Sequence, residues 1–499
     1  MNLAIVNTRA QFGMKALSIA VEVHISNGLP AFVIVGLPET VVKESKERVR
    51  SAIINCGFEF PDGRITVNLA PADIPKEGGR FDLPIAIGIL AASAQIKGDE
   101  LKDYEFAGEL ALSGDLRPVQ ASLPFAYATY LAKKKLILPK KSCIDAGFIK
   151  GVQLYPAQHL LEVCGHLQGH SPLTAYQAHD NDDETSASAI DFADVVGQTQ
   201  AKRALIVAAA GGHHVLMQGP PGTGKTMLAS RLPGILPPMN DCEAIETASL
   251  YSIRGHRLSA KSLYDRPFRS PHHTSSGIAL VGGGSNPKPG EISLAHHGVL
   301  FLDELPEFER QVLEVLREPL ESGVIHISRA KDQVEFPARF QLISAMNPCP
   351  CGYYGSSRKS CRCKPEQIQR YQSRLSGPLL DRIDLHVHIR DLPYDELIKK
   401  QKNAEENSLS IQNRVIVCRA LQIERQGVIN AQLANKALET HCTLGDTEQG
   451  ILLSAMRELQ LSPRATHRIL RVARTIADLD LSPTIAVKHL SETLSYRSP

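Results

Sequence analysis

The sequence predicts a multidomain α/β protein: a mixed α+β domain, then a doubly wound α/β domain, then a helical domain. Apolar strand patterns alternate with helical patterns around a glycine-rich motif at residues 219–226. A polar stretch at 169–188 has almost no large apolar side chains and is predicted to be a linker. Residues 396–499 have helical periodicity and few strand-like runs. The predicted domains are therefore 1–168, 189–395 and 396–499.

The composition is that of an ordinary globular protein. With 499 residues the chain can form about two to four domains, each with its own core. The formal net charge is only +2, so any nucleic-acid binding must be local. Tryptophan is absent and aromatic residues make up 5%, which argues against base stacking as the main grip.

Nothing in the sequence predicts export or membrane insertion. The longest apolar stretch, around residues 83–92, is far shorter than a membrane span. The first residues lack a basic segment followed by a long apolar core, so we expect no signal peptide. Together with ten cysteines, this predicts a cytoplasmic protein with reduced thiols and no membrane partner.

The first domain alternates strand and helix patterns. Runs of apolar and β-branched residues predict strands, and apolar positions at helical spacing predict helices. The predicted strands are 3–7, 19–25, 32–35 and 135–139, and the predicted helices are 40–54 and 81–92.

The motif at 219–226 is a complete phosphate-binding loop. An apolar strand at 214–218 precedes it and a helix at 227–232 follows it, as the G-x-x-x-x-G-K-[ST] pattern requires. The glycines let backbone N–H groups close on phosphate oxygens, Lys225 contacts the β and γ phosphates, and Thr226 contacts magnesium. The predicted ATP-binding residues are Gly219, Pro220, Pro221, Gly222, Thr223, Gly224, Lys225 and Thr226.

Two further strands end in polar residues suited to ATP hydrolysis. The run at 299–302 leads into Asp303, predicted to hold magnesium, and Glu304, predicted to polarise the attacking water. The run at 340–346 ends in Asn347, which is placed to orient that water or to contact the γ-phosphate.

The third domain is predicted to be wholly helical. Its apolar positions recur at helical spacing, and several basic residues lie between them. The predicted helices are 404–426, 432–439, 447–459, 463–479 and 483–494.

Four cysteines lie in one loop directly after Asn347. They are Cys349, Cys351, Cys361 and Cys363. Four thiolates so close in sequence suit a tetrahedral zinc site, although the C-x-C spacing is less typical than C-x-x-C. The alternative is four free thiols. A structural zinc that stiffens the loop is the favoured interpretation.

Several motifs together resemble the AAA+ ATPases. Phosphate loop, Asp-Glu strand, Asn-tipped strand and helical lid follow in that order. The segments 269–276, 282–284, 289–293 and 376–384 resemble the magnesium-chelatase-like branch, and within it the ComM family of bacterial competence proteins. The resemblance covers essentially the full chain, and it implies an AAA+ core and a lid of the magnesium-chelatase C-terminal type.

The resemblance also implies two arginines that act on the nucleotide. Arg382 matches the finger that reaches into a neighbouring subunit's site, with Arg374 as a weaker candidate. Arg464 matches the lid's sensor arginine. A planar cation can neutralise charge that builds on the transferring phosphoryl group. A finger supplied by a neighbour implies a ring, which is a homo-hexamer in the family.

The N-terminal domain resembles the Lon-protease-like (S5-type) domain through residues 108–119. Active Lon proteases need a serine and a lysine within hydrogen-bond reach. The segment 80–82 has no serine where the nucleophile is expected, and 121–123 has no lysine. The resemblance therefore implies a scaffold for ring assembly or a collar that guides DNA, without protease chemistry.

The expected partner of this ATPase is single-stranded or branched DNA. A β-hairpin at 324–336 carries Arg329 and Lys331 near its tip, and Lys288 lies on a neighbouring insertion. Cations that line a ring pore can follow a phosphate backbone without reading sequence. The resemblance implies a helicase that promotes branch migration during natural transformation, with recombination proteins as further partners.

The sequence leaves two other functions open. One is a chelatase-type remodeller, in which ATP turnover serves magnesium insertion into a porphyrin by a partner. The other is a scaffold that binds nucleotide only to assemble, against which the intact Glu304 argues. The expected cofactors are ATP and Mg²⁺, with a structural Zn²⁺ in the cysteine loop.

Overall fold

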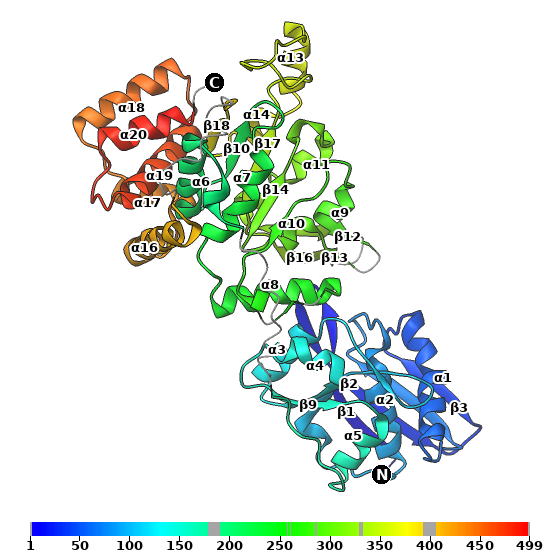
Figure 1. The fold of residues 1–499 in the computed structure, drawn as a ribbon. Coiled ribbons are helices and arrows are strands. Elements are labelled where there is room, and N and C mark those ends of the chain that lie inside the picture. The colour runs from blue at the N-terminus through cyan, green and yellow to red at the C-terminus, as the bar shows by residue number, and fades with distance from the viewer. Residues whose placement is uncertain are drawn as a thin grey trace. The chain divides into compact units, whose positions relative to one another are not determined.

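The chain folds into two compact units (Figure 1). The computed structural model describes residues 2–177, 190–256, 258–259, 261–284, 287–328, 333–392 and 406–497. The first unit contains the described residues up to 177, helix α8 (Asp241–Arg254) with the turn after it, and residues 333–335. The second contains the other described residues of the central and C-terminal regions. Most of the predicted linker at 169–188 lies outside the described residues.

A seven-stranded mixed sheet forms the base of the N-terminal unit. Its two longest strands make an antiparallel hairpin in which Leu3 lies opposite His24 and Phe12 opposite Lys15. The turn between them contains Gly13, whose φ of +54° is in the left-handed region that favours glycine. In spatial order the strands are β3 (Ala31–Val35), β4 (Arg64–Ala70), β2 (Lys15–Ser26), β1 (Leu3–Phe12), β5 (Tyr104–Phe106), β8 (Lys135–Pro139) and β9 (Gln153–Ala157).

The helices of this unit cover that sheet. Helix α2 is buried around nearly its whole circumference and forms the centre of the core, as expected for a helix that is apolar on every side. The predicted strands and helices of this region are all present, with ends that differ by a few residues. The remaining elements are α1 (Thr40–Asn55), α2 (Asp82–Ala92), β6 (Glu109–Leu110), β7 (Leu116–Arg117), α3 (Ser122–Leu131), α4 (Cys143–Ala146) and α5 (Leu160–Leu167).

Helix α8 lies in the N-terminal unit although it follows the phosphate loop in sequence. Ser252 of this helix accepts hydrogen bonds from backbone N–H groups at the start of α3. Its carbonyl oxygen accepts from the Ala121 N–H at 3.2 Å, and its Oγ accepts from the Leu123 N–H at 3.5 Å. The first N–H groups of a helix have no partner within the helix, so a residue from another segment can supply one. Helical periodicity alone did not indicate this packing.

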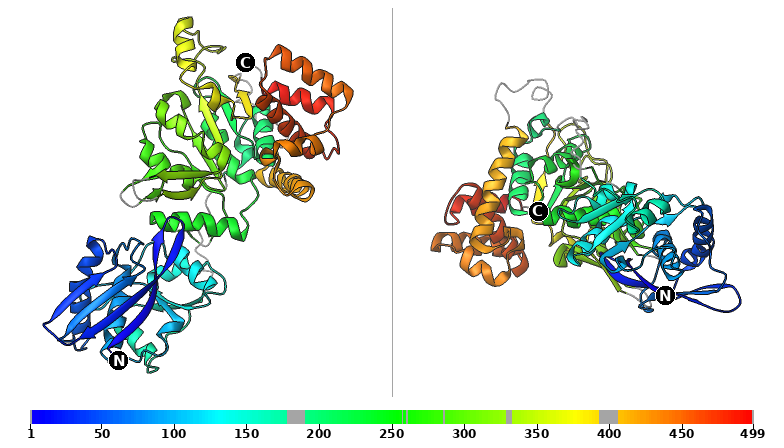
Figure 2. Two further views of the ribbon diagram at one scale, coloured as in Figure 1. Left: turned by 180° about the vertical axis from the view of Figure 1, so that it is seen from behind. Right: turned by 90° about the horizontal axis from the view of Figure 1, so that it is seen from below.

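The central domain contains a five-stranded, all-parallel sheet with helices on both faces (Figures 1 and 2). This confirms the predicted doubly wound α/β domain. In spatial order the strands are β11 (Phe268–Arg269), β14 (Val299–Leu302), β17 (Gln341–Met346), β10 (Val215–Gln218) and β18 (Leu385–His388). The helices are α6 (Thr199–Gly211), α7 (Lys225–Arg231), α9 (Gly277–Val281), α10 (Glu291–Leu294), α11 (Arg310–Val315), α12 (Pro319–Ser322), α13 (Pro365–Gln372) and α14 (Gly377–Leu380).

Two small antiparallel sheets interrupt this pattern. One pairs β12 (Gly282–Gly283) with β13 (Lys288–Pro289). The other pairs β15 (Val324–Ser328) with β16 (Gln333–Pro337), which confirms the predicted hairpin at 324–336.

Five helices complete the C-terminal region: α16 (Ser408–Gln426), α17 (Asn435–His441), α18 (Asp446–Glu458), α19 (Pro463–Leu479) and α20 (Val487–Ser495). This confirms the predicted helical domain, and α19 has the predicted bounds because its start is marked in the sequence. Ser462 caps the helix by accepting from the Ala465 N–H, and Pro463 supplies a first-turn residue that needs no donor. The predicted start of the first helix, at 404, lies outside the described residues.

A buried polar network joins this helical domain to the parallel sheet. His213 Nδ1 lies 3.3 Å from Asp384 Oδ2, and its Nε2 lies 2.8 Å from Thr475 Oγ1 on α19. Arg468, also on α19, donates to Asp384 Oδ1 at 2.6 Å. Burial alone raises the pKa of Asp384, but the His213 hydrogen bond and the Arg468 charge outweigh it and lower that pKa. The network fixes α19 beside the amino ends of β10 and β18.

In the described part of the chain, no helix combines the length and the apolar character that crossing a bilayer requires.

Candidate nucleotide site

The predicted nucleotide-binding residues meet at one edge of the central sheet. Strands β14, β17 and β10 are parallel neighbours, so their carboxyl ends lie side by side. The phosphate loop follows β10, the Asp303-Glu304 pair follows β14 and Asn347 follows β17. This edge of a parallel sheet is where doubly wound proteins bind nucleotides.

The phosphate loop needs its glycines for two different reasons. Gly222 and Gly224 have φ values of +76° and +87°, which side chains rarely tolerate. Backbone of this kind can point successive N–H groups at an anion. At Gly219 the limit is space, because a Cβ there would lie 2.4 Å from the carbonyl oxygen of Ile389.

The Lys225 ammonium lies inside the loop. Nζ donates to the carbonyl oxygens of Gly219 at 2.7 Å and Pro220 at 2.8 Å, and to Asn347 Oδ1 at 3.2 Å. Burial lowers the pKa of Lys225, while the charges of Asp303 and Glu304 act in the opposite direction. The structure therefore brings Lys225 and Asn347 into direct contact, although 122 positions separate them in sequence.

The acid pair is placed for two different tasks. Thr226 Oγ1 donates to Asp303 Oδ2 at 2.7 Å, so the two expected magnesium contacts are adjacent. Glu304 has a left-handed backbone, with φ of +52°, and its N–H donates to Asp303 Oδ1 at 2.9 Å. This turn separates the two carboxylates, and non-glycine residues in such a conformation concentrate at functional sites. Hard oxygen donors of this kind suit Mg²⁺.

His273 is a site residue to which sequence reasoning assigned no role. It follows β11, the strand next to β14, and its Nδ1 lies 3.3 Å from Glu304 Oε2. The His272 ring lies beside it, with 4.1 Å between ring centroids, but its Nδ1 contacts Thr274 Oγ1 at 2.8 Å instead. The signal that was available is positional: like Asp303 and Asn347, His273 follows the carboxyl end of a strand of the same sheet.

The two arginines implied by the resemblance lie at the opposite edge of the sheet. Arg382 precedes β18, and Arg468 of α19 donates to its carbonyl oxygen. The Arg382 guanidinium lies 2.6 Å from Glu321 Oε1, and Arg464 approaches the same oxygen at 3.7 Å. Their side chains differ in exposure, 8% for Arg382 and 72% for Arg464. Glu321 is therefore shared by both.

Arg374, the weaker candidate for the finger, pairs elsewhere. Its Nη1 donates to Glu307 Oε2 at 2.8 Å and to the carbonyl oxygen of Pro306 at 3.2 Å.

The four cysteines of the loop come together as predicted. Their sulfur atoms all lie within 4.8 Å of one another, and three of the Sγ–Sγ distances are 3.4, 3.6 and 3.7 Å. Tetrahedral zinc with Zn–S bonds of about 2.3 Å requires sulfur atoms about 3.8 Å apart. Backbone N–H groups of Arg362 and Tyr353 hydrogen-bond Cys351 and lower its pKa to about 6, whereas burial and the neighbouring cysteines raise the pKa values of Cys361 and Cys363. The cluster is thus compatible with a structural zinc site.

Of the predicted DNA contacts, one lies among the described residues. Lys288 is half-buried on β13. Arg329 and Lys331 lie outside the described residues, so the structure does not place them.

Polar side chains of the N-terminal segment 76–82 make structural contacts. Lys76 is fully buried and donates to the carbonyl oxygen of Pro71, and Arg80 donates to that of Gln120 at 3.0 Å. Asp82 accepts hydrogen bonds from Ser45 and, at 2.7 Å, from Arg48. These polar groups hold the fold together.

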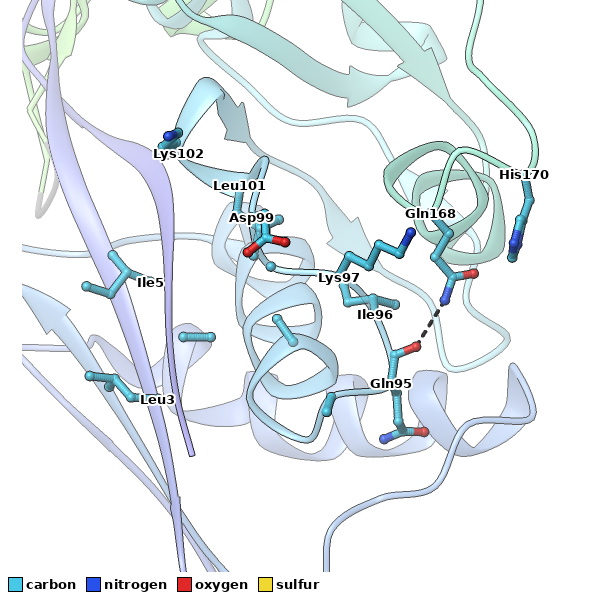
Figure 3. Close-up of a pocket in the computed structure, with 14 residues that line it drawn as sticks. Leu3, Ile5, Gln95, Ile96, Lys97, Asp99, Leu101, Lys102, Gln168 and His170 are labelled. Atoms are coloured by element: carbon cyan, nitrogen blue, oxygen red, sulfur yellow. Dashed lines mark hydrogen bonds between the residues drawn. The ribbon is translucent and has the colours of Figure 1, made fainter. Parts of the chain in front are cut away.

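The N-terminal unit also contains an open cavity of about 650 Å³ (Figure 3). Leu3, Ile5 and Ile96 line it, together with Lys97 and Asp99, and Gln168 donates to the Gln95 carbonyl oxygen at its rim. These residues form no nucleophilic or metal-binding group. The cavity belongs to a different unit from the phosphate loop.

Comparison with known proteins identifies relatives along the whole chain. Residues 191–397 match the family model of magnesium chelatase subunit ChlI, 21–142 match that of subunit ChlI of Mg-chelatase, and 405–497 match its C-terminal model. The chain is 52% identical to competence protein ComM of Haemophilus influenzae, over 100% of this chain and 98% of that one. It is 50% identical to protein YifB of Salmonella typhimurium, over 100% and 97%.

The similarity to a chelatase subunit is partial. The magnesium-chelatase 38 kDa subunit of Cereibacter sphaeroides is 28% identical over 40% of this chain and 58% of its own length.

His273 gives a direct test of the site. We predict that His273→Ala lowers kcat for ATP about tenfold and leaves KM nearly unchanged, because the side chain contacts Glu304 and none of the phosphate-loop residues. His272→Ala is the matched control, since His272 contacts Thr274 instead. Steady-state ATP turnover of the two variants checks this, and equal loss in both would show that His273 has no specific role.

Proposed function

The chain belongs to the ComM and YifB family of magnesium-chelatase-like AAA+ ATPases, and from this we propose that it is an ATP-driven DNA translocase or helicase. The proposed task is branch migration during recombination of imported single-stranded DNA. One observation carries the enzymatic part of the proposal: Lys225, Thr226, Asp303, Glu304 and Asn347 converge at one edge of a parallel sheet.

Each of these residues has a definite proposed role. Lys225 and the loop N–H groups bind the β and γ phosphates, while Thr226 and Asp303 hold Mg²⁺. Mg²⁺ supplies charge neutralisation between the β and γ phosphates when bound. Glu304 polarises the attacking water, His273 positions Glu304, and Asn347 contacts the γ-phosphate or the water.

The arginines support a ring with shared sites. Arg382 and Arg464 lie near the amino end of the sheet, whereas the phosphate loop follows the carboxyl end. Strand β10 has four residues and therefore separates the two edges by about 13 Å. A guanidinium that pairs with Glu321 at one edge is far from the phosphates at the other. We infer that Arg382 serves the site of a neighbouring protomer, in a homo-hexamer, and that Arg464 is the sensor arginine of the lid.

DNA is the proposed substrate of the motor. The strands β15 and β16 form the hairpin whose connecting residues include Arg329 and Lys331, and Lys288 lies on the neighbouring β12–β13 element. We propose that these cations face DNA in the ring pore and contact its phosphates. The relative named as a competence protein supports a DNA-linked task.

The N-terminal unit is proposed to be a Lon-protease-like scaffold without protease activity. Its candidate polar residues take part in buried structural contacts, as Lys76 and Asp82 do. A scaffold for ring assembly or a collar that guides DNA fits these observations.

A chelatase-type remodeller is the alternative function. The chain matches the 38 kDa chelatase subunit over only 40% of its length, whereas it matches ComM over all of it. The alternative therefore explains less of the chain.

A structural zinc is proposed in the cysteine cluster, held by Cys349, Cys351, Cys361 and Cys363. The sulfur–sulfur distances support it, and the site has no open position that catalysis would need. Held by these four cysteines, zinc would fix the loop that begins two residues after Asn347.

One prediction of the proposed function concerns stimulation by DNA. We expect single-stranded or forked DNA to raise ATP turnover several-fold in the wild-type protein, because a translocase couples hydrolysis to its track. Glu304→Gln should lower turnover at least about a hundredfold while ATP binding persists, as expected for loss of a general base. Coupled ATPase assays with and without DNA measure both effects. Turnover indifferent to DNA in the assembled protein would contradict the motor proposal.

Another prediction concerns shared sites. Lys225→Ala and Arg382→Ala should each lose nearly all ATPase activity, the arginine variant by about a thousandfold or more. Mixed in equal amounts and allowed to exchange, they should regain activity at about a quarter of the sites, where an intact loop meets an intact arginine. ATPase assays of the mixture, with each variant alone as control, decide the matter. No recovery after verified subunit exchange would show that Arg382 acts within its own chain.

A further prediction concerns the metal. Purified protein should contain about one zinc per chain, and Cys351→Ser/Cys361→Ser should lose it because two of four ligands are gone. Elemental analysis measures this, with Cys242→Ser as the control because Cys242 is an exposed cysteine outside the cluster. Equal zinc in both variants would rule out the cluster as its site.

A further inference from the structure

The cysteine loop and the helix after it form a small, strongly basic element. We call residues 349–372 the cysteine module. They contain five cations, Arg358, Lys359, Arg362, Lys364 and Arg370, and one acid, Glu366. That is a net charge of +4 in a segment of a chain whose total is +2. Zinc bound by four thiolates would add a net −2 and leave the module positive.

Four of the five cations have no acidic partner. Lys359, Arg362, Lys364 and Arg370 are exposed, and no carboxylate of the described residues lies within ion-pair distance of them. Arg358 is different, because it pairs with Asp391 at 3.8 Å and donates to the Leu392 carbonyl oxygen, and so anchors the module. Surface cations are usually interspersed with acids, so an unpaired group of four indicates a surface that attracts anions.

Aromatic side chains accompany these cations. Tyr354 is 54% exposed although it carries a large aromatic ring, and the Lys359 ammonium lies 5.1 Å from the centre of the Tyr353 ring. A single-strand binding surface has two components: cations that bind phosphates, and an exposed aromatic ring on which a base can stack. An acidic protein segment would use the cations but has no need of the ring.

The base of the module touches the nucleotide site. A Cβ on Gly352 would lie 2.8 Å from Cδ of Pro221 in the phosphate loop. The Asn347 backbone N–H hydrogen-bonds the phenol oxygen of Tyr371, and Gln372 donates to the Pro348 carbonyl oxygen at 3.1 Å. Helix α13 projects from the body of the central domain in Figure 1. The module thus has a basic surface, and its base contacts the phosphate loop.

We propose that the cysteine module is a second DNA-binding site, separate from the proposed pore residues. Arg362, Lys364 and Arg370 bind backbone phosphates of single-stranded DNA, and Tyr354 stacks on an unpaired base. Through Asn347 and Pro221, DNA on the module acts on the ATP site. The inference rests on the proposed function, in which DNA is the substrate.

The test uses the full-length protein and a fluorescein-labelled oligothymidine, with binding followed by anisotropy over a range of KCl concentrations. For Lys364→Gln/Arg370→Gln we expect about tenfold weaker binding. We also expect the slope of log K against log salt to become shallower by about 1.4, since each phosphate contact on a single strand contributes about 0.7. Tyr354→Ser should weaken binding about tenfold with the slope unchanged, because stacking releases no counterions.

The matched control is Lys436→Gln/Arg457→Gln, which removes two exposed cations from α17 and α18. It should bind as the wild type does. Zinc content equal to the wild type shows that the module is intact in each variant, and DNA-stimulated ATPase activity should fall with binding while basal activity stays the same.

Two outcomes would overturn this inference and leave the proposed function standing. In the first, the wild type binds the oligothymidine and the module variants bind it equally well; in the second, the control variant loses as much binding as the module variants do. An acidic protein as the true partner would produce the first of these. If the wild-type protein itself does not bind the oligothymidine, the proposed function fails and this inference fails with it.

Discussion

The common direction of strands β10, β14, β17, β11 and β18 is the constraint on which the site depends. In a parallel sheet every strand ends at the same edge, so residues far apart in sequence are delivered to one place without a dedicated scaffold. Lys225 and Asn347 meet in this way, and so do Thr226 and Asp303. A reversed strand would remove its terminal residue from the site altogether. The order of the strands therefore matters as much as the residues they carry.

The same geometry places the phosphate-binding residues and the two arginines at opposite edges of the sheet. The carboxyl edge has the phosphate loop, the acid pair and Asn347, while Arg382 and Arg464 lie toward the amino edge around Glu321. The buried network of His213, Asp384 and Arg468 holds the arginine-bearing elements there. The network holds the backbone of these elements near the amino ends of β10 and β18, and the length of β10 separates that edge from the phosphate loop by about 13 Å. In the proposed ring, the amino edge of one protomer would face the carboxyl edge of the next, and Arg382 would reach the neighbour's phosphate site.

Sequence patterns predicted the phosphate loop, the acid pair at the end of β14 and the capped start of α19 because each depends on a few adjacent residues. The structure has all three where the sequence indicated. The contact between His273 and Glu304, and the carboxylate shared by Arg382 and Arg464, are instead products of tertiary packing. So is the packing of α8 on α3 through Ser252. Periodicity reports which face of a helix is apolar, but it does not report which partner covers that face.

The cysteine loop combines a local sequence signal with tertiary packing. Asn347 ends a buried strand and lies beside Lys225, and Cys349 follows only two residues later. Tyr371, on the far side of the loop, is bound back to the Asn347 backbone, and burial raises the pKa of its phenol to about 12, so it stays neutral at physiological pH. A neutral phenol adds no charge beside the phosphates, while the cations of the module remain at its surface. With the proposed zinc bound, a loop closed by four sulfur ligands and held at both ends near Asn347 would resist bending and would transmit force from its surface to the residue that contacts Lys225. Stiffness is thus the property that would let a surface element influence ATP hydrolysis, and the proposed zinc on the four cysteines would supply it.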